Sequence, residues 1–126
     1  MKRLQMFVAP IVALLLVGAL APSSFAAKKG DPKAGKKSFS TLCASCHGET
    51  GKGDGPAAAT LPTKPKDLAD AKHMNSLKDA YLFKVIKEGG ASVGKSPLMP
   101  PWGSQLKDQD IWDVVAYIRT LAKSGK

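Results

Sequence analysis

The sequence predicts an all-α fold of three main helices joined by two long loops. Two observations support this prediction. Apolar residues recur at helical spacing in three segments, and no segment shows the alternation expected of a half-buried strand. The segments between them are rich in Gly and Pro, which favour turns and irregular loops. Residues 27–126 are therefore expected to form one domain, small enough to depend on a disulfide, a metal or another cofactor for stability.

Residues 1–26 carry the features of an export signal. Two basic residues begin the chain, an apolar run of 14 residues follows in "FVAPIVALLLVGAL", and "SSFA" supplies small residues for cleavage. A membrane-spanning helix needs roughly 20 apolar residues, and a proline and a glycine interrupt this shorter run. We therefore predict cleavage after Ala26 or Ala27, a periplasmic location and no stable membrane anchor.

The first helix is predicted to begin after Asp31, which is a good N-cap, with Pro32 at the first helical position. Gly48 is placed to end this helix. The apolar positions at helical spacing are Ala34, Phe39, Leu42 and Cys46.

The second helix follows an irregular stretch from Gly48 to about Asn75. A loop of this length is unusual in a compact domain unless it encloses something. The helix itself is predicted to begin with Ser76 as its cap, to contain a capping box completed by Asp79, and to end at Gly89. Its apolar faces contain Leu77, Tyr81 and Val85, and Leu82 and Ile86.

The last helix has the clearest pattern and follows a second Gly- and Pro-rich loop, "GGASVGKSPLMPPWGSQL". Asp108 and Asp110 lie at its start, and Arg119 and Lys123 lie near its end, an arrangement that is favourable with the helix dipole. Its predicted core stripe contains Ile111, Val114, Val115, Ile118 and Leu121.

Both cysteines and one of the two histidines lie within "CASCH", residues 43–47. Residues three apart share a face of a helical turn, so Cys43 and Cys46 are expected to project together, with His47 on the neighbouring strip. This geometry suits a haem whose vinyl groups accept the thiols as thioethers while His47 binds the iron. C-x-x-C-H is the attachment pattern of c-type haem. One covalent haem c would also give the long loops something to enclose.

Three alternatives to haem are weaker. A disulfide between Cys43 and Cys46 would close a very short loop, and short loops contribute least to stability. A thioredoxin-like redox pair needs a βαβ context that the sequence lacks. A zinc site that also used His47 and His73 would need two adjacent ligands, a poor spacing for one tetrahedral ion.

The candidates for a second axial ligand of the iron are Met99, Met74 and His73. Met99 lies in "SPLMPPW", where three prolines stiffen the backbone and can hold a thioether at a fixed distance. Met74 is interpreted as core filler. His73 lies in the polar segment "DAKHMNS" and is expected to be a solvated surface residue.

The mature chain resembles the class I c-type cytochromes, the small bacterial monohaem electron carriers, over about residues 34–121. The resemblance rests, in chain order, on "AGKKSFSTLCASCHG", "GKGDGPAA", "VIKEGG", "PLMPPWGSQL" and "DIWDVVAYIRTL". It implies the cytochrome c fold, with helices and long loops wrapped around one covalently attached haem. It also implies thioethers at Cys43 and Cys46, and axial iron ligands at His47 and Met99.

The resemblance implies further roles for other residues. A proline carbonyl after the haem motif is expected to accept the ring N–H of His47, and Pro56 matches that position; such an acceptor fixes the orientation of the imidazole. Trp102 is expected to pack on the haem or to reach one of its propionates, and a simple core or rim aromatic is the alternative. Close contact between the first and last helices is expected at Gly35, Phe39 and Tyr117.

The predicted function is periplasmic transfer of single electrons through a His/Met-ligated haem. Such an iron has no free coordination position, and the chain offers no catalytic constellation, so we do not expect an enzyme. Two alternatives remain open. The chain could be the haem c subunit of a larger dehydrogenase or oxidase, or a haem enzyme or gas sensor in which Met99 is labile.

The charge of the chain favours an acidic redox partner. Removing Lys2 and Arg3 leaves 17 basic against 10 acidic residues, a net charge of +7. A positive face around the haem edge, including Lys52 and Lys95, would steer docking onto such a partner, although a simple solvated surface is an alternative. Export and the scarcity of arginine argue against nucleic-acid binding. A monomer is expected.

Overall fold

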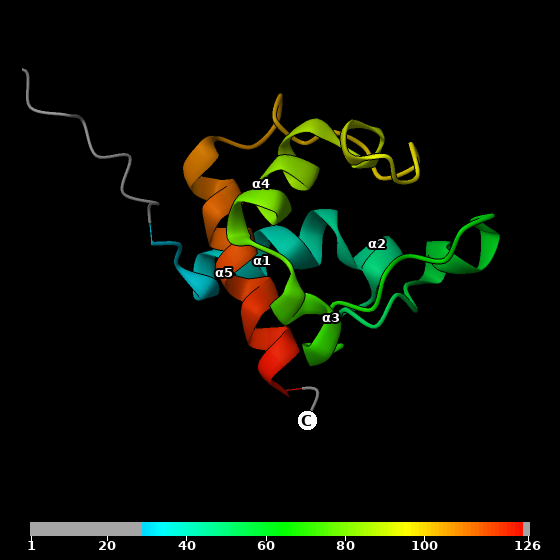
Figure 1. Cartoon of the computed structure of the whole chain (residues 1–126), viewed down its shortest axis with the longest axis horizontal. Coiled ribbons are helices and arrows are strands. Elements are labelled where there is room, and N and C mark those ends of the chain that lie inside the picture. Colours follow the sequence, from blue (N-terminus) through cyan, green and yellow to red (C-terminus); the bar gives the residue numbers. More distant parts are fainter. Residues whose placement is uncertain (1–28, 125–126) are drawn as a thin grey trace, which may run out of the picture.

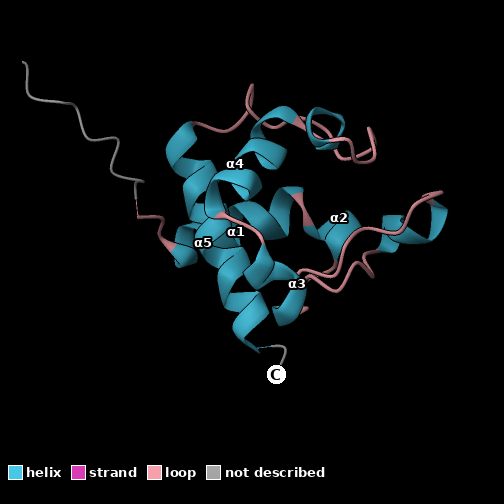
Figure 2. Cartoon of the chain, in the orientation of Figure 1, coloured by secondary structure: helices cyan, strands magenta, loops and turns pink. Residues whose placement is uncertain are grey.

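The computed structural model describes residues 29–124, and this range contains helices and loops but no strand (Figures 1 and 2). The predicted all-α class is confirmed. The export signal predicted for residues 1–26 lies outside the described residues. None of the helices in the described range is long and apolar enough to span a membrane. The α-helices are α1 (Pro32–Leu42), α2 (Ala44–His47), α3 (Ala71–Ser76), α4 (Asp79–Glu88) and α5 (Asp108–Ser124), and the 3-10 helices are η1 (Pro56–Thr60) and η2 (Gly90–Val93).

The three predicted main helices correspond to α1, α4 and α5. The Asp31 carboxylate caps α1 by accepting the Lys33 backbone N–H at 2.8 Å. The predicted first helix is divided in two, because Cys43 forms a turn between α1 and α2. Gly48 ends α2 with φ 78°, as predicted, a conformation that glycine adopts without strain.

The capping box predicted at Ser76 and Asp79 is wrong. Asp70 caps an earlier, short helix, α3, by accepting the His73 backbone N–H at 3.0 Å. Ser76 is the last residue of α3, and its hydroxyl donates to the His73 carbonyl at 2.6 Å. The Asp79 carboxylate is used elsewhere, because it accepts a hydrogen bond from Arg119 Nε at 2.8 Å.

Among the described helices, α1 and α5 make the most extensive contact, where they cross (Figure 1). A Cβ atom built on Gly35 would lie 1.9 Å from the backbone carbonyl oxygen of Asp113, so only glycine permits this approach. Next to it, the Phe39 and Tyr117 rings pack edge to face with their centroids 5.2 Å apart. These contacts confirm the roles predicted for Gly35, Phe39 and Tyr117.

A buried carboxylate fixes the start of α1 on α5. Asp113 is 8% exposed, and its Oδ1 accepts the Asp31 backbone N–H at 2.8 Å and Gln109 Nε2–H at 2.9 Å. Burying a carboxylate is costly unless hydrogen bonds compensate for the lost water. The hydrogen bond from the Asp31 N–H to the Asp113 carboxylate therefore favours the orientation of α1 in which this bond can form.

Helix α4 packs against α5 and completes the core. The Phe83 and Trp112 rings stack with centroids 4.4 Å apart. The predicted stripe of α5 is confirmed at four of its positions, while Leu121 is only half-buried. The buried members of the stripe are Ile111, Val114, Val115 and Ile118, and those of α4 are Leu82 and Ile86.

We predict that Gly35→Ala destabilises the holo-protein, because its added methyl group has no space at the α5 backbone. The expected loss in the free energy of unfolding is about 1–3 kcal/mol, measured by denaturant titration. Lys36→Ala, at an exposed position of the same helix, should change it by less than about 0.5 kcal/mol. Equal stability of the two variants would show that the crossing is not constrained at Gly35.

Candidate functional site

A largely apolar cavity of about 600 Å³ lies between α1, α2, α3, α4, α5 and the loops that connect them. Its volume falls within the range of roughly 300–1,000 Å³ that is typical of small-molecule and cofactor sites. Residues from distant parts of the sequence line it together. Those predicted to hold a cofactor are Cys43, Cys46, His47, Met99 and Trp102.

The two cysteines enter this cavity as free thiols. Cys43 is buried, and the backbone N–H of His47 donates to its carbonyl at 2.9 Å, which holds the "CASCH" turn. Burial raises the pKa of the Cys43 thiol to about 11, and the nearby Cys46 contributes further. Cys43 is therefore protonated at neutral pH, and the structure contains no disulfide in its described part.

His47 is half-buried and lines the cavity. Burial lowers the pKa of its imidazole, and the Lys66 backbone carbonyl acts in the opposite direction. The ring is accordingly neutral at neutral pH, which is the form that binds a metal. Its Nδ1 atom is buried and has no hydrogen-bond partner among the described residues. Buried polar groups in folded proteins are nearly always hydrogen-bonded, so we expect an acceptor for the N–H at this nitrogen.

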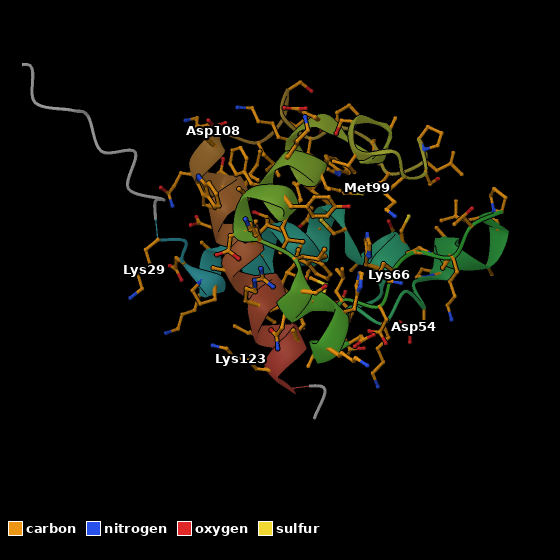
Figure 3. The ribbon with its side chains drawn as sticks, in the orientation of Figure 1. Lys29, Asp54, Lys66, Met99, Asp108 and Lys123 are labelled. Atoms are coloured by element: carbon orange, nitrogen blue, oxygen red, sulfur yellow. The ribbon has the colours of Figure 1, made fainter. Side chains whose placement is uncertain are left out.

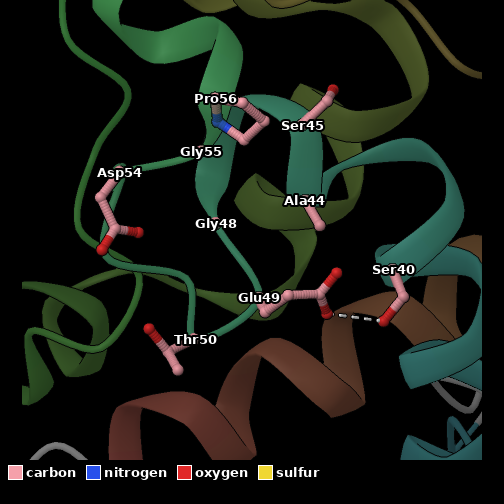
Figure 4. Close-up of a pocket in the computed structure, with 9 residues that line it drawn as sticks. All are labelled: Ser40, Ala44, Ser45, Gly48, Glu49, Thr50, Asp54, Gly55 and Pro56. Atoms are coloured by element: carbon pink, nitrogen blue, oxygen red, sulfur yellow. Dashed lines mark hydrogen bonds between the residues drawn. The ribbon is translucent and has the colours of Figure 1, made fainter.

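Pro56, which was predicted as that acceptor, begins η1 next to Ser45 (Figure 4). Within residues 29–124, His47 Nδ1 forms no hydrogen bond with Pro56 or with any other residue. The Lys66 backbone carbonyl is the one that acts to raise the pKa of the His47 ring. Lys66 follows a different proline, Pro65, in the segment "TKPKDL".

A glycine turn brings this segment to His47. Gly51 and Gly53 both have φ 75°. The Gly53 N–H donates to the His47 carbonyl at 2.8 Å, and the Leu68 N–H donates to the Gly51 carbonyl at 2.7 Å. A Cβ atom on Gly53 would lie 2.3 Å from the Pro65 carbonyl oxygen. The turn therefore packs directly against the chain that carries Lys66.

Met99 reaches the cavity from the loop that follows η2 (Figure 3). Its carbonyl accepts the Gly90 N–H at 2.9 Å, and its own N–H donates to the Ser96 carbonyl at 3.2 Å. The next part of the loop is attached to α4, since the Trp102 N–H donates to the Ile86 carbonyl at 2.9 Å. Met99 and Trp102 are both half-buried on the cavity wall.

The other two candidates for the second axial ligand lie on α3. Met74 is 0% exposed and belongs to the hydrophobic core, as expected of core filler, but it also lines the cavity. His73 was expected to be solvated, but it is half-buried and lines the cavity. The polar residues around His73 suggested a surface position. Helix α3, on which His73 lies at the cavity wall, was not predicted from the sequence.

A second depression, of about 560 Å³, lies behind the "CASCH" turn (Figure 4). There Ser40 Oγ–H donates to Glu49 Oε2 at 3.1 Å. This depression is lined by no His, Cys or Met. Within the described range, no three His, Cys, Asp or Glu side chains gather where they could hold a metal ion, so the zinc alternative gains no support.

The charges around the cavity are of one sign. Lys64, Lys66 and Lys95 line it, and no Asp or Glu does. Lys95 was predicted at this face. Lys52 was predicted with it but is not among the lining residues. Lys64 and Lys66 were missed, because their loop gave no signal that it would fold back onto His47.

The cavity fits a haem c group. It combines two free thiols, a neutral imidazole and a thioether from a separate loop, all within an apolar wall. The comparison with known families decides its identity, since residues 32–122 match the cytochrome c family. The chain belongs to the cytochrome c family. Its cofactor is haem c, attached covalently, and membership supports a role in haem-based electron transfer.

Several relatives of this cytochrome are cytochromes c6. The protein of Pyropia yezoensis is 32% identical over 99% of both chains, and that of Porphyra purpurea is 34% identical over 72% of both. A different relative is the FixP subunit of a cbb3-type cytochrome c oxidase from Azorhizobium caulinodans. It is 33% identical over 75% of this chain, which spans only 30% of that longer subunit.

We predict that Gly53→Ala lowers the stability of the holo-protein, because the added methyl group would displace the Pro65 carbonyl from the turn. The expected loss in the free energy of unfolding is about 1–3 kcal/mol beyond that of Gly94→Ala. Gly94 is a matched control, because its φ is 70° but nothing lies within 4 Å of a built Cβ. Equal losses for the two variants would mean that only backbone strain, and no packing against Pro65, constrains Gly53.

Proposed function

We propose that this cytochrome transfers single electrons in the periplasm through a haem c held by Cys43, Cys46, His47 and Met99. One observation carries the proposal: the thiols, the imidazole and the thioether line the same apolar cavity. Residues 1–26, with their export-signal pattern, support the periplasmic location.

Attachment requires only the two thiols of the "CASCH" turn. Each would add across one vinyl double bond of the haem, its sulfur bonding to one carbon and its proton going to the other. The reaction needs no oxidant. Haem c supplies a one-electron iron couple when bound. Because the turn is closed by backbone hydrogen bonds, Cys43 and His47 are held in a fixed relation before attachment.

His47 and Met99 are proposed as the axial ligands. We assign the Lys66 carbonyl, in place of Pro56, as the acceptor of the His47 Nδ1–H, which would fix the ring and raise its basicity. The Gly90 and Ser96 bonds hold the Met99 backbone on the cavity wall, from which its thioether would bind the iron. With both His47 and Met99 bound, the iron would have no position for a substrate, and this favours an electron carrier over an enzyme.

A second candidate function is that of a haem subunit in a larger oxidase complex. The match to the FixP subunit favours it, because that subunit contains a stretch similar to this chain. Size-exclusion chromatography of native periplasmic extract separates the two proposals: a free carrier elutes near its own mass, and a subunit elutes with the complex.

Ligation is tested with the two methionines of the cavity. Met99→Ala should abolish the methionine–iron charge-transfer band of the ferric protein and permit rapid cyanide binding. Met74→Leu keeps a similar volume in the core and should retain the band. Loss of the band in Met74→Leu with retention in Met99→Ala would assign the ligand to Met74. A wild-type protein without the band, which binds cyanide readily, would support the haem enzyme or gas sensor.

The lysines of the cavity support docking to a redox partner with an acidic surface. The charged residues of the lining, Lys64, Lys66 and Lys95, are all positive, and Leu98, which is 50% exposed, adds an apolar residue to the same lining. Positive potential at the mouth of a cleft raises the encounter rate with anions and lowers it with cations. The surface therefore favours an acidic protein.

We predict that Lys95→Glu slows oxidation by ferricyanide at low salt by about three- to tenfold and accelerates oxidation by a cationic cobalt complex. Stopped-flow absorbance measures both rates. Lys123→Glu is the control, since it makes the same charge change at the end of α5 far from Met99 (Figure 3). Equal effects of the two variants would show that only net charge acts.

A further inference from the structure

Arg119 is not one of the proposed haem-binding residues, but it forms hydrogen bonds with part of the cavity wall. We propose that Arg119 is a positioning residue: it fixes residues 74–79, the elbow between α3 and α4, and so keeps water away from the haem. The inference rests on the proposed haem site, because this elbow forms part of the cavity wall.

The guanidinium group of Arg119 joins α5 to the elbow through three partners. Its Nη1 donates to the Met74 carbonyl at 2.5 Å, and its Nη2 donates to the Leu77 carbonyl at 2.6 Å. Its Nε donates to Asp79 Oδ1 at 2.8 Å. The group is only 22% exposed, so these bonds form largely away from water. One side chain thus binds the last turn of α3, one of the two connecting residues and the first residue of α4.

The elbow needs this attachment because α3 has only six residues. A helix of that length is unstable by itself, and its last carbonyl groups depend on partners outside the helix. The Met74 carbonyl accepts the Leu77 N–H at 3.2 Å as well as the bond from Arg119. The planar guanidinium can donate to several acceptors at fixed angles, which an ammonium group cannot do. Arg119 is the one arginine in the described range, although that range contains many lysines.

The same elbow forms the cavity wall. Met74 is 0% exposed there, and Leu77 and Tyr81 line the cavity beside it. If the elbow moved, water would reach the haem from this side. Water stabilises the more highly charged ferric state, so greater exposure lowers the reduction potential. Arg119 therefore influences the haem through Met74 and Leu77, without touching it.

The ion pair with Asp79 is the smaller part of this interaction. The Asp79 carboxylate is 59% exposed, and exposed ion pairs contribute little to stability. The two carbonyl bonds hold the backbone of the elbow itself. Removing the Asp79 charge should therefore leave the wall in place, whereas replacing the guanidinium should release it.

The test compares Arg119→Lys, Arg119→Gln and Asp79→Asn as holo-proteins. Arg119→Lys keeps the charge but loses the paired donors. Both Arg119 variants should show a lower reduction potential and about tenfold faster hydrogen exchange at the α3 amides. Asp79→Asn should change neither. A potential that is unchanged in both Arg119 variants would overturn the proposal. A potential lowered only in Arg119→Gln would also overturn it, since charge alone would then be responsible.

The wild-type protein gives a second test that needs no variant. The Nε–H of Arg119 should exchange with solvent at least about tenfold more slowly than that of free arginine. Exchange at the free rate would contradict the proposed contacts. This result is separate from the proposed function: a wild-type spectrum without the methionine–iron band would contradict Met99 ligation while leaving the exchange result intact.

Discussion

The close approach of α1 to the α5 backbone is the constraint on which the rest of the structure depends. Gly35 permits it, and the bond between Asp31 and Asp113 fixes its direction. Helix α1 continues through Cys43 into the "CASCH" turn, so the crossing sets where the thiols and His47 lie. Helix α5 also carries Arg119 and packs against α4, so it sets the opposite wall. Both sides of the cavity therefore depend on one contact, at which Gly35 lets the α1 and α5 backbones approach each other.

Long loops, rather than helices, bring the remaining site residues into place. The turn at Gly51 and Gly53 returns the chain to His47, and the Gly90 bond holds Met99. Apolar residues of both loops line the cavity, among them Leu61, Leu68, Met99 and Trp102. A ligand that binds only the folded state stabilises it. A covalently attached haem would therefore contribute to the core as well as to electron transfer.

The sequence predicts those parts that depend on local chemistry. Helical spacing identified the buried residues of α5, Asp31 marked the start of α1, and "CASCH" identified residues that do share one cavity. The predictions were wrong or missing where contacts between distant segments determine the position of a residue. Helix α3 is too short and too polar to show a periodic pattern. Its position depends on Arg119, which lies far along the chain in α5. Lys66 lies near His47 because of the glycine turn, and no motif in its own segment distinguishes it from the residues around Pro56.

The ligands of the iron in the holo-protein can be measured by X-ray absorption at the iron edge, which reports the ligand elements and their distances in both oxidation states. We expect a single sulfur ligand in the ferric and the ferrous protein, with nitrogen atoms in the other positions, and loss of this sulfur ligand in Met99→Ala. Iron surrounded by nitrogen and oxygen alone, or a sulfur ligand that is retained in Met99→Ala, would contradict this expectation.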